Sequence, residues 1–360
     1  MTNTMHAVQL TGHGGFEKLE YRTDIPVPTP GPQDVLIRVS ACGINNTDIN
    51  TRVGWYSKSV TTATNDGGSG GFDDADDDDG GWSGALAFPR IQGADCCGTI
   101  VAVGSEADAG RIGERVIVRT MQDVHDEGVP FACITYGSEM DGGFAQYAVA
   151  HQKEAYTVNA DWSDAELASI PCAYSTAENM LHRIKLGAER VLITGASGGV
   201  GSAAVQLAKR RGAEVIALAS AAKHDDVKAL GADLVLDRNA DLVSALGKES
   251  VDVVVDLVAG DGWPPLLDIL KRGGRYTTAG AIAGPLVELD VRTLYLKDLT
   301  FYGCTYQDEA AFRNLVSYIE NNEIRPLVAK TYPLQDIVQA QQDFLAKQFT
   351  GKLVLIPPQD

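Results

Sequence analysis

A glycine-rich turn in the middle of the chain limits the fold more than any other feature of the sequence. The apolar run that starts at Val191 enters a turn in which Gly195, Gly198 and Gly201 recur at every third position, and an alanine-rich segment follows. Glycines at this spacing let phosphate oxygens approach the backbone and let a helix pack closely on a strand. The first helical turn points free N–H groups and the positive end of its dipole at an anion. The turn therefore predicts a pyrophosphate site, with these expected contacts: Gly195, Ala196, Ser197, Gly198, Gly199, Val200 and Gly201.

The segments around the turn support a dinucleotide site. Residues 200–211 have apolar positions on one helical face, and residues 212–219 form the next apolar strand. This order predicts a βαβ unit of the length that a dinucleotide-binding domain requires. The alternative is an ordinary strand-to-helix turn in another kind of α/β domain.

The end of the second strand of this unit indicates which dinucleotide binds. A site for NAD usually has an acidic residue there, which accepts hydrogen bonds from the ribose hydroxyls and repels a 2′-phosphate. This chain has Ser220 and Lys223 instead, and Arg238 follows the third expected strand. A hydroxyl and two cations suit a phosphate, so the sequence favours NADPH over NADH. The alternative is that both cations are ordinary solvated surface charges.

Composition restricts the class of protein. A chain of 360 residues, with 44% hydrophobic and 22% charged residues, suits a globular protein of two domains. We expect a cytoplasmic protein, because no basic segment precedes an apolar run at the amino terminus and no apolar segment reaches membrane-spanning length. A net charge of −18 disfavours nucleic acid and anionic membranes as partners. Six cysteines without a CxxC spacing argue against a zinc ribbon or a disulfide scaffold.

Much of the negative charge lies in one glycine-rich and aspartate-rich segment at 65–84. Such a composition buries little apolar surface, and it predicts a flexible loop. An EF-hand is disfavoured, because Ala75 and Leu86 stand where its pattern needs acidic residues. The segment begins soon after Tyr56, so it is also a candidate lid over a substrate site.

The remaining pattern separates two regions. Short β-branched or alternating runs predict a β-rich first region, with strands at 5–10, 34–42, 98–103, 114–118 and 144–150. Residues 164–186 have helical spacing and lead into the βαβ unit. Later strands and helices alternate, which predicts a parallel sheet covered on both faces. A helix at 334–347 and a strand at 352–356 close the chain and are expected to return to the first region.

These segments resemble the medium-chain dehydrogenase/reductase superfamily, and within it the zinc-free quinone oxidoreductase-like branch. The resemblance rests on the glycine turn and on residues 31–39, 41–48, 93–104, 113–116 and 351–355. It implies an α/β chain with a GroES-like β-rich catalytic domain and a Rossmann domain, with substrate and nicotinamide meeting in the cleft between them. The expected domains are 1–158, with a flexible insert at 58–86, then 159–305 for NADP binding, and a returning segment at 306–360. The resemblance also implies a homodimer.

The chain departs from the zinc alcohol dehydrogenases of this superfamily at their metal ligands. Asn45 and Ala94 stand where those enzymes have a cysteine and a histidine ligand, and only Cys172 matches the remaining ligand. A catalytic zinc needs about three protein ligands. The sequence therefore predicts no metal. An unorthodox metal site is the alternative, formed by Cys42, Cys96, Cys97 and Cys172.

A metal-free reaction favours a substrate that delocalises negative charge itself. We expect NADPH-dependent reduction of a quinone or an α,β-unsaturated carbonyl compound, an enone or enal. The resemblance makes Asn45 and Tyr56 candidate donors to substrate, and Asn45 also a candidate contact of the nicotinamide ribose. Asp48 and Asp95 are expected to hold the polar network. Further candidate cofactor contacts are Thr176, Val258, Ala259, Ala281, Ile282, Cys304 and Lys352.

Two other functions are consistent with the sequence. One is an alcohol or aldehyde dehydrogenase of the same superfamily that uses zinc or an atypical metal site. The other is a nicotinamide-binding protein that has lost its chemistry, because the sequence does not identify a single indispensable catalytic acid.

Overall fold

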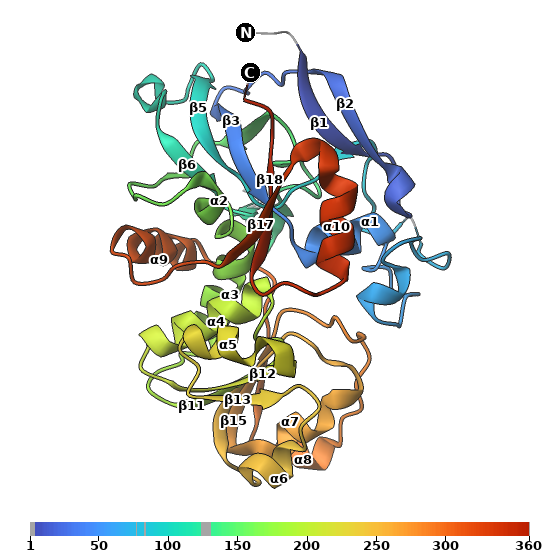
Figure 1. Ribbon diagram of the computed structural model, residues 1–360, viewed down its shortest axis with the longest axis vertical. Helices are drawn as coiled ribbons and strands as arrows, with labels where there is room; N and C mark the ends of the chain where they lie inside the picture. Colours follow the sequence, from blue (N-terminus) through green and yellow to red (C-terminus); the bar gives the residue numbers. More distant parts are fainter. Residues whose placement is uncertain (1–3, 77, 83, 124–130, 360) are drawn as a thin grey trace. The chain divides into compact units, whose positions relative to one another are not determined.

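The computed structural model describes residues 4–76, 78–82, 84–123 and 131–359 (Figure 1). It divides into two compact units. Unit 1 comprises Met1–Val60, Asn65–Cys172 and Val316–Asp360, and unit 2 comprises Thr61–Thr64 and Ala173–Leu315. The chain passes from unit 1 to unit 2 inside helix α3 (Pro171–Arg183) and returns to unit 1 inside helix α9 (Glu309–Glu320). The sequence placed these two boundaries at 158/159 and 305/306. A helix that continues across a boundary has no break in its residue pattern to mark the boundary.

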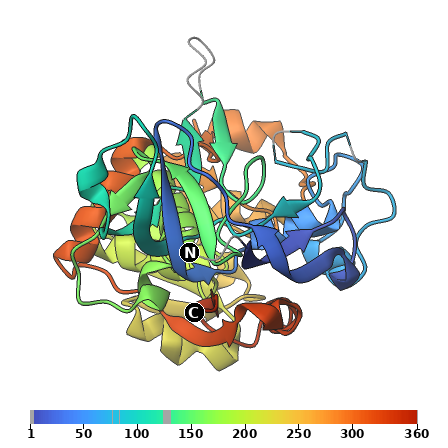
Figure 2. The ribbon, with the colours of Figure 1, turned by 90° about the horizontal axis from the view of Figure 1, so that it is seen from above.

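Unit 1 is rich in strands. Its strands are β1 (Thr4–Leu10), β2 (Leu19–Pro26), β3 (Asp34–Gly43), β4 (Arg90–Ile91), β5 (Cys97–Val103), β6 (Arg115–Val118), β7 (Met121–Asp123), β8 (Cys133–Thr135), β9 (Tyr147–His151), β10 (Ala155–Thr157), β17 (Val328–Pro333) and β18 (Lys352–Ile356). Its main sheet has the order β10-β6-β5-β3-β18-β17, and β9 also pairs with β3. Figure 2 shows the blue β3, the teal β5 and β6 and the green β9 side by side.

Residues from both ends of the chain build the core of unit 1. Alternating side chains of β3, β5 and β6 fill one cluster, including Ile37, Val39, Ile100 and Val118. Strand β18 pairs antiparallel with β3, and the short pairing joins Val354 and Leu355 to the end of β3. The carboxyl-terminal strand therefore returns to the first region, as the sequence predicted. This return brings Lys352 beside residues that lie some three hundred positions earlier.

The helices of unit 1 are short and carry the polar residues discussed below. They are α1 (Asn46–Val53), α2 (Asp164–Leu167) and α10 (Ile337–Leu345). Residues 164–186 were expected to form one helical segment, but the structure ends α2 at Leu167 and starts α3 at Pro171. The ring of Pro171 disfavours a helical conformation at the residue before it, and it is well accommodated in the first turn of a new helix.

Unit 2 contains a six-stranded parallel sheet. Its strands are β11 (Arg190–Ile193), β12 (Glu214–Ala219), β13 (Leu234–Asp237), β14 (Val251–Asp256), β15 (Leu270–Thr278) and β16 (Thr300–Gly303). Their order is β13-β12-β11-β14-β15-β16, and every neighbouring pair is parallel. The chain reverses its winding direction between β11 and β14, and ligands bind at such a switch point, at the carboxyl ends of the strands.

Helices connect the strands of this sheet. They are α4 (Gly199–Arg210), α5 (His224–Ala229), α6 (Leu242–Leu246), α7 (Pro264–Ile269) and α8 (Val291–Leu296). The central strands β11 and β14 are buried almost throughout, which is typical of a parallel sheet covered on both faces. Strand β15 begins at Leu270, directly after α7. The mixed α/β fold that was predicted is confirmed.

Candidate functional site

The glycine turn lies between β11 and α4 and has the close packing that a phosphate cradle needs. Gly195 has a φ of +58°, a conformation that L side chains rarely adopt. A Cβ on Gly201 would lie 2.2 Å from the backbone oxygen of Gly195, so only glycine fits there. Helix α4 begins at Gly199 directly after the turn and has twelve residues. The backbone N–H groups of its first turn are therefore available to an anionic ligand, and these residues fit a pyrophosphate.

The residues predicted to distinguish the dinucleotides follow β12 and β13. Lys223 closes a short 3-10 turn that starts after Ser220, and the backbone N of Arg238 donates to the oxygen of Ala219 over 3.0 Å. Burial lowers the pKa of Lys223, the nearby Asp226 raises it, and the charge of Arg238 lowers it further. The two cations are therefore close enough to repel each other, and an anion placed near both would relieve that repulsion.

The other candidate cofactor contacts of unit 2 lie on several elements. Val258 and Ala259 follow β14, Ala281 and Ile282 follow β15, and Cys304 follows β16 directly. All five therefore follow the carboxyl ends of parallel strands, the edge at which ligands bind such a sheet.

Thr176, the remaining candidate of unit 2, lies on helix α3, which precedes the first strand of the parallel sheet. Its hydroxyl accepts a hydrogen bond of 2.9 Å from Nε2 of Gln307. Sequence reasoning missed Gln307, which is 2% exposed and also accepts from the hydroxyl of Ser175 over 2.6 Å. No local pattern marks a glutamine whose partners lie more than 130 positions earlier.

In unit 1, three of the predicted residues meet in one buried network. The ammonium of Lys352 donates to Oδ1 of Asn45, to Oδ2 of Asp95 over 2.9 Å and to the backbone oxygen of Ile44 over 3.0 Å. Nδ2 of Asn45 donates to the same Asp95 oxygen over 2.9 Å. Lys352 is 3% exposed and Asp95 is fully buried. Lys352 was expected to contact the cofactor; the structure shows that its ammonium makes three hydrogen bonds within unit 1.

Asp48 joins this network through the backbone. Its carboxylate accepts from the backbone N of Asn45 over 2.8 Å and from that of Ala94 over 3.3 Å. Asn45 and Asp48 thus form a capping box at the start of α1. Burial raises the pKa of Asp48 to about 7, backbone hydrogen bonds oppose the shift, and the charge of Asp95 adds to it. Asp48 therefore titrates near neutral pH, although it is an aspartate.

Tyr56 follows α1 and lies beside an aromatic side chain of the insert. Its hydroxyl donates to Oγ1 of Thr47 over 3.2 Å, and burial raises its pKa. The ring centroid of Trp82 lies 5.3 Å from that of Tyr56, and the ring of Trp55 packs edge-on at 5.8 Å. Tyr56 is therefore held in its phenol form and is a group that can donate a proton or a hydrogen bond.

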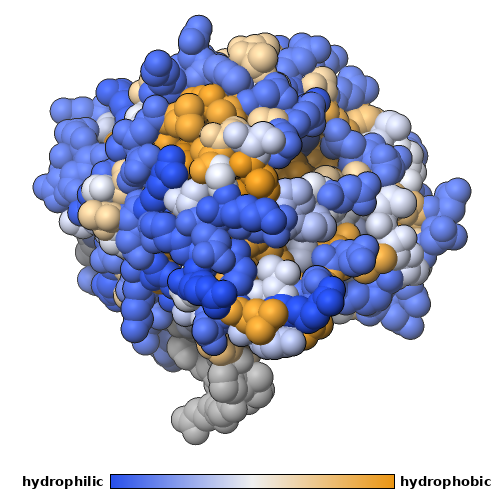
Figure 3. Space-filling view, turned by 90° about the horizontal axis from the view of Figure 1, so that it is seen from below, coloured by the Kyte–Doolittle hydropathy of each residue, from blue (hydrophilic) through white to orange (hydrophobic). Residues whose placement is uncertain are grey.

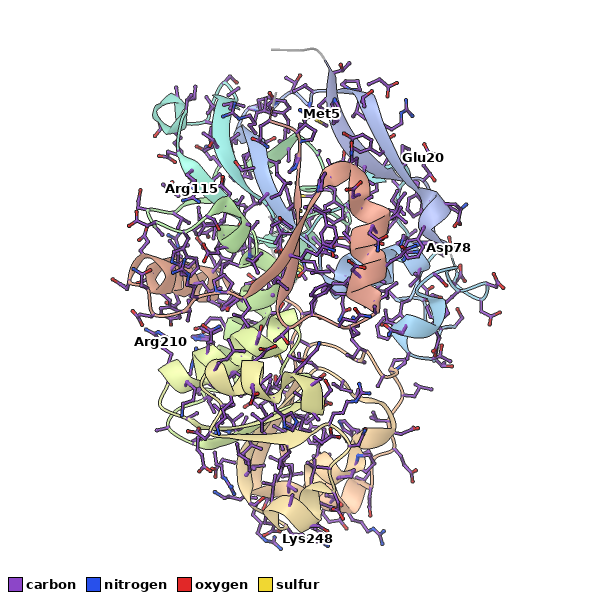
Figure 4. The ribbon with its side chains drawn as sticks, viewed as in Figure 1. Met5, Glu20, Asp78, Arg115, Arg210 and Lys248 are labelled. Atoms are coloured by element: carbon purple, nitrogen blue, oxygen red, sulfur yellow. The ribbon has the colours of Figure 1, made fainter. Side chains whose placement is uncertain are left out.

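The described part of the insert makes more contacts than its composition indicates. The fully buried guanidinium of Arg52 donates to the backbone oxygens of Gly68, over 2.6 Å, and Gly14, over 2.8 Å. The backbone N of Phe72 donates to the oxygen of Val53. Asp78, labelled in Figure 4, is exposed and belongs to the acidic run. One backbone hydrogen bond, from Phe72, and one side-chain hydrogen bond, from Arg52, therefore tie the segment at 68–72 to α1.

The cysteines do not gather into a metal centre in the described part of the chain. Cys42, Cys96, Cys97 and Cys172 are buried and form no disulfide, and burial raises the pKa of each thiol. Among the residues that the structure describes, no three His, Cys, Asp or Glu side chains are grouped so that they could hold a metal ion. The Sγ of Cys42 instead donates to the backbone oxygen of Asp95. No helix in the same described residues is both long and apolar enough to cross a membrane.

Comparison with known proteins matches both units to dehydrogenases. Residues 31–160 match the alcohol dehydrogenase GroES-like domain, and residues 199–321 match the zinc-binding dehydrogenase domain. A quinone oxidoreductase of Lama guanicoe is 29% identical over 98% of this chain and 97% of its own length. An acryloyl-coenzyme A reductase of Sulfurisphaera tokodaii is 25% identical, over 98% of this chain and all of its own.

A solved structure is more similar still. A provisionally named alcohol dehydrogenase from Sinorhizobium meliloti 1021 is 47% identical and has a TM-score of 0.89. The match covers 99% of this chain and 98% of that protein. The similarity to dehydrogenases of this family therefore extends over nearly the whole chain.

Proposed function

Because the chain belongs to the medium-chain dehydrogenase/reductase superfamily, in its quinone oxidoreductase-like branch, we propose that it reduces a quinone or an α,β-unsaturated carbonyl compound with NADPH and without zinc. It is an oxidoreductase of that family with a nicotinamide-type cofactor. The observation that carries the finer proposal is the buried network of Asn45, Asp95 and Lys352. A quinone oxidoreductase and an acryloyl-coenzyme A reductase among its relatives support the substrate class.

The network supports a reaction without zinc on electrostatic grounds. Asn45 stands at a position where zinc enzymes of the family have a thiolate ligand, and its Oδ1 already accepts from the Lys352 ammonium. A divalent ion next to Asn45 and Asp95 would be repelled by that ammonium at close range in a buried setting. Lys352 supplies one positive charge where the metal enzymes carry two, and its three hydrogen bonds leave no N–H for substrate.

Without a metal to polarise a carbonyl, the substrate has to spread the negative charge itself. The nicotinamide supplies a hydride when bound, and conjugation in a quinone or enone carries the charge to oxygen. Tyr56 is the donor we assign to that oxygen, because its raised pKa keeps its hydroxyl protonated and its one O–H can turn from Thr47, 3.2 Å away, to the substrate. Asn45 and Asp95 hold the start of helix α1, and Tyr56 comes shortly after the end of that helix. We therefore assign Asn45 and Asp95 a role in positioning Tyr56.

The preference for NADPH rests on Ser220, Lys223 and Arg238. Two cations and a hydroxyl beyond β12 and β13 form a recognition site for a 2′-phosphate, and no acidic residue directly follows β12. Val258, Ala259, Ala281, Ile282, Cys304 and Thr176 remain proposed contacts of the nicotinamide side.

Oxidation of NADPH and of NADH against a panel of quinones, enones, enals and alcohols tests this proposal. We expect turnover with quinones or enones, and a lower dissociation constant for NADPH than for NADH. Tyr56→Phe is expected to lower kcat by about tenfold to a hundredfold and to leave the dissociation constant of NADPH unchanged. Tyr21→Phe, at a tyrosine that pairs with His6, is the matched control. Full turnover by Tyr56→Phe would remove Tyr56 from the donor role.

A zinc-dependent alcohol dehydrogenase is the second candidate, because the solved relative at 47% identity has an alcohol dehydrogenase name. Metal analysis of the purified protein separates the two. Stoichiometric zinc, with alcohol oxidation that a chelator abolishes, would establish the second candidate. Tight binding of NADPH with no turnover on any member of the panel would indicate a nicotinamide-binding protein without chemistry.

We further infer a homodimer, formed through unit 2. Five of its large apolar side chains are exposed within one short stretch: Leu286, Val287, Val291, Tyr295 and Leu296. Helix α8 in this stretch leads directly to β16, an edge strand of the sheet. Figure 3, which looks from the side of α6 and α8, shows hydrophobic surface gathered in patches. An apolar patch beside an open strand edge suits a second copy of the chain.

Sedimentation of the protein at several concentrations tests the dimer. Tyr295→Lys, in the patch, is expected to shift the protein to monomer, whereas Tyr21→Lys, in unit 1, leaves the dimer intact. A protein that is monomeric at all concentrations would disprove this inference.

A further inference from the structure

The fully buried carboxylate of Asp256, the last residue of β14, accepts hydrogen bonds from side chains on both neighbouring strands. Its Oδ1 accepts from the hydroxyl of Thr194 over 2.6 Å, and its Oδ2 accepts from the hydroxyl of Tyr276 over 2.7 Å. Thr194 directly follows β11, and Tyr276 lies in β15. One carboxylate thus ties together three adjacent strands near their carboxyl ends, on both sides of the sheet's switch point.

The same carboxylate shapes the loop that follows β14. Oδ1 accepts from the backbone N of Val258 over 3.0 Å, and Oδ2 accepts from that of Ala259 over 3.2 Å. Ala259 has a φ of +53°, which is unfavourable for a residue with a Cβ. Such a conformation is strained and persists only where the surroundings hold it. The hydrogen bonds that the backbone N–H groups of Val258 and Ala259 donate to Asp256 are therefore a local restraint on this strained turn.

The loop connects Asp256 to the cofactor turn. A Cβ on Gly195 would lie 3.3 Å from Cγ2 of Val258, so the loop packs against the glycine turn. The backbone oxygen of Val258 accepts from the N of Ala283 over 2.9 Å, and a Cβ on Gly260 would lie 2.8 Å from the oxygen of Ala283. The loop at 257–260 is thus packed between the glycine turn and the segment at 281–284, which follows β15.

The contacts require an acid at position 256. Every partner in these hydrogen bonds is a donor, and the two backbone N–H groups cannot reverse their role. An asparagine would point its NH2 group at donors on one side. None of the ion pairs found in the described residues involves Asp256, so its negative charge is held by hydroxyls and backbone N–H groups. A carboxylate in this setting is costly to bury, which indicates that its hydrogen bonds perform a specific task.

We propose that Asp256 is a positioning residue that sets the loop at 257–260 for the nicotinamide half of the cofactor. The inference rests on the proposed function, in which the cofactor is NADPH. A doubly wound sheet binds one nucleotide over each half, and Ser220, Lys223 and Arg238 place the 2′-phosphate on the β12 and β13 side. The nicotinamide half then belongs to the β14 and β15 side, where Asp256 holds Val258 and Ala259.

Binding of whole and partial cofactors to the full chain tests this assignment. Dissociation constants are measured for NADPH and for 2′,5′-ADP, a fragment that has the 2′-phosphate and lacks nicotinamide. Asp256→Asn is expected to raise the constant for NADPH by about tenfold or more, and the constant for 2′,5′-ADP by less than about twofold. Asp261→Asn, an exposed carboxylate five residues later, is the matched control and leaves both constants unchanged.

Two outcomes would overturn the inference: an unchanged constant for NADPH in Asp256→Asn, or equal losses for NADPH and 2′,5′-ADP. The second would mean a general structural role. If Asp256→Asn does not fold, Tyr276→Phe removes a single donor to Oδ2. That variant is expected to raise the constant for NADPH by about threefold and to spare 2′,5′-ADP.

The behaviour of the unmodified protein separates this inference from the proposed function. If it binds NADH and not NADPH, the proposed cofactor preference is wrong, and the same contrast is expected between NADH and ADP-ribose. If it binds no nicotinamide cofactor, both proposals fail.

Discussion

The ammonium of Lys352 and the carboxylate of Asp95 form a buried ion pair, with 2.9 Å between Nζ and Oδ2. The two residues lie 257 positions apart in the chain, and neither side chain is more than 3% exposed. Their pairing fixes the amide of Asn45 from both sides, because Lys352 donates to its oxygen and its nitrogen donates to Asp95. The start of α1, and with it Asp48, is therefore anchored by the last strand of the chain.

Lys352→Met is expected to destabilise the protein strongly. Removing one partner of a buried ion pair leaves an uncompensated charge on Asp95, which costs about 3–5 kcal/mol. Urea unfolding measures the change in the free energy of unfolding. Lys330→Met is the control, because the Lys330 side chain is 45% exposed, and the loss of its pair with Asp343 is expected to have a much smaller effect. Equal effects of the two substitutions would contradict the importance of the buried pair.

The raised pKa of Asp48 leads us to expect that the free energy of unfolding depends on pH. Its pKa is raised from 3.8 to about 7 in the folded protein, so the folded state binds more protons than the unfolded state between these two values. The contribution of Asp48 to stability is therefore fully present below pH 4 and is lost as the pH rises through 7.

Asp48→Asn removes this titration. Subtracting the free energy of unfolding of the unmodified protein from that of Asp48→Asn isolates the effect of Asp48. This difference should grow in favour of the variant between pH 4 and 7, by at most about 1.4 kcal/mol per pH unit. A difference that does not change with pH would show that Asp48 titrates at its ordinary pKa.

The buried side chain of Arg52 holds part of the insert, so we expect that part to resist proteases. Burial lowers the pKa of Arg52 to about 10, which leaves it charged at neutral pH and able to hold the oxygens of Gly68 and Gly14. Arg52→Met should expose the segment at 64–72 to limited proteolysis and lower the free energy of unfolding by about 3 kcal/mol. Arg22→Met, which breaks an exposed pair with Asp24, is the control. If the unmodified protein is cut there as fast as the variant, Arg52 does not restrain the insert.

We expect Lys223 and Arg238 to set the preference for NADPH over NADH. Lys223→Gln or Arg238→Gln should each raise the dissociation constant of NADPH by about tenfold to a hundredfold, because each removes a charged contact to the 2′-phosphate. The constant for NADH should not change. Lys228→Gln, an exposed lysine on α5, is the matched control and should change neither constant. Parallel losses for NADPH and NADH would place these cations elsewhere in the cofactor site.

Local pattern identified much of the fold. Gly195 and Gly198 sit in the predicted strand-to-helix turn, Gly201 lies in the first turn of α4, and β18 (Lys352–Ile356) has the predicted bounds. Spacing of apolar residues and glycine turns is a property of neighbouring residues, so a single sequence displays it. The break between α2 and α3 was not predicted. The apolar spacing of 164–186 favours one continuous helix, whereas Pro171 disfavours a helical conformation at the residue before it.

The sequence by itself determined the βαβ unit, the dinucleotide turn and the loss of two zinc-ligand residues at Asn45 and Ala94, because each of these is written in residue types at short spacing. Only the tertiary structure decided what replaces them. Lys352 reaches Asn45 and Asp95 because β18 pairs with β3, and Asp256 ties Thr194 to Tyr276 because their strands are neighbours in the sheet. Strand order and burial bring these residues together. They lie far apart in the chain, so no pattern of neighbouring residues in the sequence indicates that they are partners.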